Sequence, residues 1–90
     1  MAYHVYILQS QSTGRYYIGH TDDPARRVRQ HNDPTYHGSK TTKRFQGPWE
    51  LVYRETSESR SSAMLREKEI KGWKSRKMVA QLVESRHCRD

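Results

Sequence analysis

The chain has 90 residues, enough for one small domain, since domains typically span ~50–250 residues. Seventeen Lys and Arg stand against ten Asp and Glu, a formal net charge of +7, and no apolar run approaches the ~18 residues that a membrane-spanning helix needs. The single cysteine, Cys88, excludes an intrachain disulfide and a thiolate zinc cluster. We therefore expect a cytoplasmic domain without a membrane partner, whose excess of arginine points to nucleic acid.

The apolar content is low for a folded protein. Leu, Ile, Val and Phe together make up 13 of the 90 residues, which with the high charge is typical of disordered chains. Six Tyr, two Trp and three Met add large apolar side chains that can close a small core. We expect a folded domain near the lower size limit.

The first twenty residues predict an antiparallel hairpin. Residues Tyr3–Gln9 (YHVYILQ) are β-branched and aromatic, which favours a strand. Ser10–Gly14 has turn chemistry, and Arg15–His20 (RYYIGH) reads as the returning strand.

A short helix and a third strand follow. Asp23 is a capping carboxylate and Pro24 suits the first helical position, so a helix is predicted over 24–31. Residues 33–48 contain proline, glycine and polar side chains typical of a loop. Trp49–Glu55 (WELVYRE) alternates sufficiently to form a strand.

Two helices complete the chain. The first is predicted over Ser59–Lys71 and is stopped by Gly72. Ser75 is expected to cap the second, whose apolar residues repeat at helical spacing: Met78, Val79, Leu82 and Val83.

The element order ββαβαα predicts an α+β fold, a small three-stranded antiparallel sheet flanked by helices. We assign residues 1–84 to one domain and 85–90 to a short C-terminal tail.

Two tyrosines and a basic helix are candidates for chemistry. Alternation places Tyr6 opposite Val5 and Ile7, but the register that would bring it beside Tyr17 is not fixed by sequence. Both rings are read either as core edges or as hydroxyls presented to a substrate. On the helix, Arg27 and His31 are four residues apart and share one face. They are either a solvated surface or a pair that holds a phosphate and moves a proton.

Glu67 has an unexpected position. Ala63, Glu67 and Ile70 follow the inward stripe of the predicted helix, so a carboxylate stands where an apolar residue is expected. Such a group must be paired, hydrogen-bonded or bound to a metal, and Glu69 points elsewhere. An ion pair with an arginine and a one-carboxylate Mg²⁺ site both fit this position.

Three segments in order resemble the motifs of the GIY-YIG nuclease family. Val5-Tyr6-Ile7 and Tyr17-Ile18-Gly19 resemble its two signature halves. The helix with Arg27, His31 and Asn32 is similar to the family's Arg-x-x-x-His-Asn segment, and the stretch from Ala63 to Lys71 resembles its glutamate-bearing helix. The resemblance covers residues 3–83 and matches small stand-alone bacterial members.

The resemblance implies a DNA endonuclease that uses Mg²⁺ or Mn²⁺ in DNA repair, recombination or processing. Glu67 would hold the metal, Arg27 would stabilise the developing charge, and Tyr6, Tyr17 and His31 would position water and move protons. The base among these three stays open, as do DNA versus RNA, the substrate's structure and a protein partner that supplies specificity. The cations expected to contact nucleic acid are Arg15, Arg26, Lys40, Lys43, Arg44, Arg60, Lys68, Lys71, Lys74 and Lys77.

Two other classes of function account for part of the same pattern. A nucleic-acid-binding module that kept the fold but lost efficient cleavage explains the charge, yet leaves the joint presence of Tyr6, Tyr17, Arg27 and Glu67 without a reason. A basic domain that binds another protein explains neither the arginine bias nor the inward glutamate.

Overall fold

Three antiparallel strands form the sheet in the computed structural model, which describes residues 2–33 and 48–87. The central strand β1 (Tyr3–Ser10) pairs with β2 (Tyr16–Thr21) on one side and with β3 (Trp49–Ser57) on the other. Strand β2 is therefore an edge strand. The predicted three-stranded antiparallel sheet is confirmed.

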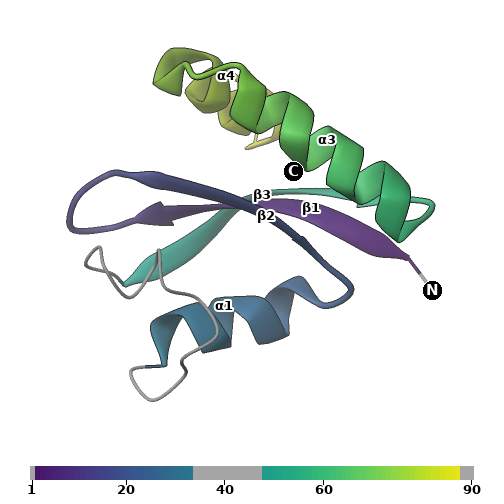
Figure 1. Ribbon diagram of the computed structural model, residues 1–90. Helices are drawn as coiled ribbons and strands as arrows, with labels where there is room; N and C mark the ends of the chain where they lie inside the picture. The colour runs from purple at the N-terminus through teal and green to yellow at the C-terminus, as the bar shows by residue number, and fades with distance from the viewer. Residues whose placement is uncertain (1, 34–47, 88–90) are drawn as a thin grey trace.

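Helices cover both faces of this sheet (Figure 1). Helix α1 (Pro24–Asn32) lies against one face, and α3 (Arg60–Gly72) and α4 (Arg76–His87) lie against the other. The α+β class and the order ββαβαα are confirmed. Helix α4 continues through residues 85–87, which the sequence analysis assigned to the tail. Within the described ranges, no helix is long and apolar enough to cross a membrane.

The central strand is buried on both sides. Four consecutive residues of β1, Val5, Tyr6, Ile7 and Leu8, are each at most 1% exposed. Val5 and Ile7 pack beneath α3 and α4, whereas Tyr6 and Leu8 pack on the α1 side. A sheet with helices on both faces needs such a continuous apolar run, and the strand supplies it.

The predicted start signals of the helices act as caps. The Asp23 carboxylate accepts a hydrogen bond from the Arg26 backbone N–H at 3.1 Å, and Pro24 occupies the first turn of α1. At the start of α4, the Ser75 hydroxyl oxygen accepts from the Met78 N–H at 3.3 Å.

The end of α3 differs from the prediction that Gly72 stops it. Gly72 is still helical, and the chain leaves the helix at Lys74, whose φ of +49° lies in the left-handed region. Trp73 and Lys74 donate their backbone N–H groups to Ile70 and Lys71, which satisfies the last turn. The helix ends one residue later than predicted, and a lysine, not the glycine, adopts the left-handed conformation.

Candidate active site

The strand register brings the two candidate tyrosines together. Tyr6 lies opposite Gly19 and Leu8 lies opposite Tyr17, so both tyrosines face α1. Their ring centroids are 6.2 Å apart. This register answers the question that strand alternation left open.

Gly19 makes room for the Tyr6 ring. A Cβ added at Gly19 would lie 2.7 Å from the Tyr6 hydroxyl oxygen and 2.8 Å from Cζ, closer than real Cβ atoms come to other atoms. Because glycine has no side chain, the phenol can lie flat across the edge strand. The glycine therefore fixes where the Tyr6 hydroxyl sits.

His31 completes a buried cluster with the two tyrosines. It lies in the last turn of α1, is only 2% exposed, and its Nε2 is 3.0 Å from the Tyr6 hydroxyl oxygen. The Tyr17 and His31 ring centroids are 4.7 Å apart. Burial raises the pKa of Tyr6 to about 12, so its hydroxyl keeps its proton at neutral pH. In the tautomer with Nδ1 protonated, that hydroxyl donates to Nε2.

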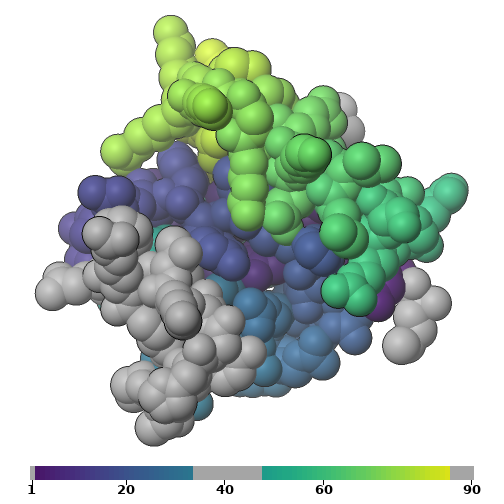
Figure 2. Space-filling view, in the orientation of Figure 1, coloured from purple at the N-terminus to yellow at the C-terminus, as the bar shows by residue number. Residues whose placement is uncertain are grey.

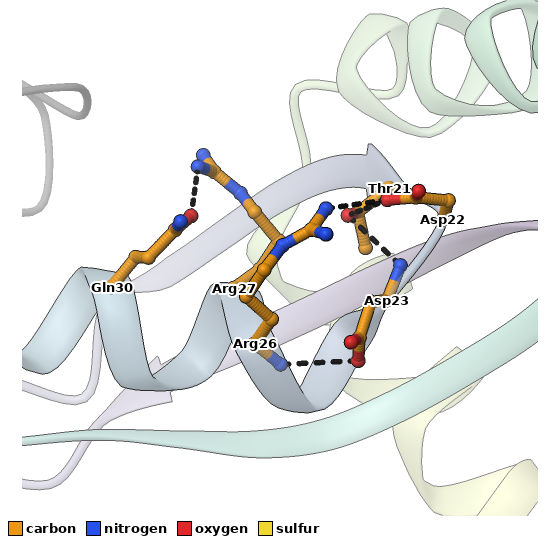
Figure 3. A network of polar contacts seen from close by, with 6 residues as sticks. All are labelled: Thr21, Asp22, Asp23, Arg26, Arg27 and Gln30. Atoms are coloured by element: carbon orange, nitrogen blue, oxygen red, sulfur yellow. Dashed lines mark hydrogen bonds and ion pairs between the residues drawn. The ribbon is translucent and has the colours of Figure 1, made fainter.

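Arg27 brings positive charge to this cluster, where it acts on Tyr6. Figure 3 shows the Arg27 side chain beside Gln30 on α1. One guanidinium nitrogen, Nη1, donates to Gln30 Oε1 at 2.7 Å, one turn along α1. Burial dominates the high pKa of Tyr6, and the hydrogen bond and charge of Arg27 act in the opposite direction. The neighbouring Arg26 instead forms an ion pair with Asp22, and this contact lowers the pKa of Asp22. Thus Arg27 belongs to the site, and the charge of Arg26 is partly offset.

Glu67 is paired on the opposite face of the sheet. Its side chain is 19% exposed, with Oε1 2.7 Å from His20 Nδ1 and Oε2 2.9 Å from Lys71 Nζ. Partial burial acts to raise the pKa of Glu67, but the hydrogen bonds from His20 and Lys71 outweigh it and the pKa lies below its usual value. The inward carboxylate is therefore ionised and paired, as its position required, but with His20 and Lys71 in place of the arginine considered from sequence.

The two halves of the site meet across the edge strand. Gly19 lies under Tyr6 on the α1 side, and the next residue, His20, faces Glu67 on the α3 side. The charge of Glu67 contributes to the raised pKa of Tyr6, so the groups act on each other electrostatically. One strand, β2, separates them.

The donor set at Glu67 fits a hydrated hard cation. Mg²⁺ favours oxygen ligands, keeps several waters and often takes one or two carboxylates plus substrate phosphate. Glu67 is ionised and partly exposed, and each of its oxygens has a second lone pair beyond its present hydrogen bond. No cluster of three or more His, Cys, Asp and Glu suited to a metal occurs in the described part of the chain. A cage built from protein alone is therefore absent there, and the one-carboxylate arrangement is the one that fits.

Six of the predicted nucleic-acid contacts lie at the surface of β2, α3 and α4 or just before them. All six side chains belong to exposed residues: Arg15, Arg60, Lys68, Lys71, Lys74 and Lys77. Three others, Lys40, Lys43 and Arg44, lie outside the described residues.

His20 is a site residue that was not among the candidates predicted from sequence. Strand alternation could have indicated its position, because it puts residue 20 on the face of β2 opposite Tyr17 and Gly19. Its partner Glu67 is 47 residues away in the chain, and nothing in local sequence connects the two.

The fold and this cluster define the class of protein: a small α+β domain with tyrosine, histidine, arginine and glutamate gathered at one sheet edge. A family model described as the GIY-YIG catalytic domain matches residues 2–79. The chain belongs to the GIY-YIG family, as its three motifs indicated.

Relatives of known name match part of the chain. A protein of Trypanosoma cruzi named structure-specific endonuclease subunit SLX1 homolog 1 is 53% identical over 51 residues, which cover 53% of this chain and 10% of that protein. Structure-specific endonuclease subunit SLX1 of Meyerozyma guilliermondii is 48% identical over 52 residues, covering 56% of this chain and 18% of that protein. The match thus spans less than a fifth of the length of either.

A solved structure matches almost the whole chain. The solution NMR structure of a UPF0213 protein from Bacillus halodurans has a TM-score of 0.56 and 38% sequence identity. The alignment covers 93% of this chain and 84% of that one. The small single-domain type inferred from the motifs agrees with this match.

Proposed function

We propose that the protein is a metal-dependent endonuclease that hydrolyses phosphodiester bonds in nucleic acid, with DNA as the expected substrate. The observation that carries the proposal is the Tyr6–His31 hydrogen bond of 3.0 Å beside Arg27, with an ionised Glu67 across the edge strand. Membership of a catalytic-domain family and the names of the SLX1 relatives support it. A role in DNA repair or processing, with a protein partner that adds specificity, is part of the same proposal.

Tyr6 and His31 would move the proton of the attacking water. A phenol with a pKa of about 12 is not a preformed base at neutral pH. If Tyr6 passes its own proton to His31 Nε2 as it takes one from water, tyrosinate never accumulates. Water oxygen then bonds to phosphorus, the P–O bond to the leaving oxygen breaks, and the leaving oxygen takes a proton from solvent. His31 is thus the final proton acceptor.

The charges around the phosphate would come from Arg27 and Glu67. Arg27 donates to the nonbridging oxygens, where negative charge develops in the transition state. Glu67 would hold Mg²⁺ or Mn²⁺, which when bound supplies Lewis-acid stabilisation of the phosphate and leaving oxygen. His20 and Lys71 keep the Glu67 carboxylate in place and ionised.

The test is cleavage of fluorescently labelled duplex, single-stranded and branched DNA and RNA with and without Mg²⁺. The wild-type protein should cut at least one substrate, and EDTA should abolish cutting while binding persists. Glu67→Gln, which keeps the shape of the side chain, should lower the rate by ~10²-fold or more, since the metal ligand is lost.

Glu69→Ala is the matched control. Glu69 lies on the same helix but not in the cluster, and its side chain is 58% exposed. It forms a 3.0 Å ion pair with Arg66. Its loss changes the net charge of α3 as much as Glu67→Gln does and should leave the rate unchanged. Cutting that persists in Glu67→Gln would indicate a contaminant and refute the mechanism. Salt-dependent binding without cutting under any condition would favour a binding module.

A further inference from the structure

A recess lies beside the candidate active site. An open cleft of about 580 Å³ separates the start of β2 and the turn before it from the α3–α4 junction. Figure 2 shows these segments, blue to purple and green, facing each other on one side of the molecule. The volume falls within the ~300–1,000 Å³ of small-molecule sites.

The cleft has a cationic rim and an apolar floor. Four cations line it, from the β1–β2 turn, α3, the α3–α4 connection and α4: Arg15, Lys71, Lys74 and Arg76. None of the described lining residues is acidic, and Ile70 and Val79, which are at most 6% exposed, form part of the floor. Anionic phosphate suits such a rim, and a flat, weakly polar base suits such a floor. The combination matches the two ends of one nucleotide.

A cation–π pair lies among the residues that line the cleft. The Arg76 guanidinium carbon lies 5.9 Å from the centroid of the Tyr16 ring, a cation–π distance. Arg76 Nη2 also donates to the Gly14 carbonyl oxygen at 3.1 Å. A Cβ at Gly14 would lie 2.8 Å from Nη2, so this glycine leaves room for the guanidinium. Aromatic rings and guanidinium planes are the surfaces on which unpaired bases stack.

Lys74 is held in a costly conformation at the rim. Its φ of +49° is one that glycine adopts without strain and lysine does not. No hydrogen bond or ion pair joins its ammonium group to another of the described residues. The left-handed turn ends α3, and a lysine at this position, where glycine would cost less, puts an exposed ammonium at the cleft.

We infer that this cleft binds one unpaired nucleotide of the substrate, with its base against Tyr16 and Arg76 and its phosphate at Lys74. The cleft adjoins the active site, because Lys71 lines it and also bonds Glu67 at 2.9 Å. Bases of a continuous duplex are stacked inside the helix and do not enter such a recess. The inference rests on the proposed nuclease function and narrows its substrate to nucleic acid with a single-stranded stretch beside the cleaved bond.

The test measures binding in EDTA, so that its result does not depend on cleavage. Fluorescence anisotropy compares a DNA duplex that carries a single-stranded overhang with a fully paired duplex of the same total length. A 2-aminopurine base in the overhang reports stacking through quenching. Wild-type protein should bind the overhang substrate about tenfold more tightly, since stacking of one base contributes at this scale, and should quench the probe.

Lys74→Gly tests the binding role of Lys74 separately from its effect on stability. It removes the strain, so the melting temperature should stay the same or rise, while the salt dependence of binding to the overhang substrate should fall by about one unit of slope. Tyr16→Leu keeps an apolar side chain and should abolish quenching. Arg29→Ala, on the exposed side of α1, removes the same charge and should keep both the overhang preference and the quenching.

Three outcomes would overturn the inference: equal affinity of wild-type protein for the two substrates, quenching that survives Tyr16→Leu, or unchanged overhang binding in Lys74→Gly. Each leaves the proposed nuclease intact if Mg²⁺-dependent cutting is still lost in Glu67→Gln. Conversely, preferential overhang binding without any cutting would support the cleft and refute the nuclease.

Discussion

Replacing Gly19 by alanine tests whether the position of the Tyr6 hydroxyl controls the reaction. The new Cβ would lie 2.7 Å from that oxygen, and ordinary contact begins at 3.4 Å, so one group must move by about 0.7 Å. Tyr6 is 1% exposed and bonded to His31, so its ring has no open space to enter. A shift of this size away from His31 would stretch the 3.0 Å hydrogen bond to about 3.7 Å, too long for a hydrogen bond.

The expected costs follow from that displacement. Misplacing a catalytic group by ~1 Å can cost ~10²-fold in rate, so the Gly19→Ala protein should cleave roughly 10- to 100-fold more slowly. Overpacking a buried site typically costs ~1–3 kcal/mol, and each kcal/mol lowers the melting temperature of a domain this size by ~4–8 °C. Single-turnover cleavage well below the melting temperature, with a thermal melt of the same sample, measures both effects.

Gly72→Ala is the control for a glycine that needs no space. No described atom outside its own helix and its chain neighbours lies within 4 Å of a Cβ there, and alanine favours a helix over glycine by ~0.5–1 kcal/mol. The variant should melt a few degrees higher and cleave at the wild-type rate. A folded Gly19→Ala protein that cuts as fast as wild type would refute the assignment of the Tyr6–His31 pair to proton transfer.

Three further changes test other parts of the structure. Tyr6→Phe should cut ~10²-fold or more slowly than the wild-type protein. Because the folded pKa of Tyr6 is about 12 and the unfolded value is 10.0, its contribution to stability is complete below pH 10 and is lost from pH 10 to 12. The melting temperature of Tyr6→Phe should therefore fall less than that of the wild-type protein over that range. Asn32→Ala removes two hydrogen bonds to the Trp49 backbone, of 2.7 and 2.9 Å, that join α1 to β3. In denaturant titration it should lower the free energy of unfolding by ~1–3 kcal/mol, and an unchanged midpoint would show that these two bonds are dispensable. Arg66→Ala breaks a 2.6 Å bond to Glu55 and should lower the melting temperature while leaving the salt dependence of DNA binding unchanged; a changed slope would place Arg66 at the nucleic acid instead.

The positions of single side chains were predictable wherever one element decides them. Helical spacing alone put Glu67 on the inward face of α3, and strand alternation put Tyr6 opposite Val5 and Ile7. The pairing of Tyr6 with Gly19 required the register, which depends on how three strands align and is not written in any one of them. The same limit applies to the cleft, because the residues that line it come from β2, the turn before it, α3 and α4, and these lie far apart in the chain.

The left-handed residue at the end of α3 shows a different limit. Sequence preference placed the stop at Gly72, because glycine adopts that conformation at the lowest cost. The structure gives it to Lys74 instead, which leaves Gly72 inside the helix at a cost and strains a lysine as well. Both the helical glycine and the left-handed lysine lower stability, and exchanging the residues at positions 72 and 74 would be a simple sequence change. A need for a positive charge at position 74, which lies at the cleft, explains the left-handed lysine, and the change in melting temperature of Lys74→Gly measures what that charge costs the fold.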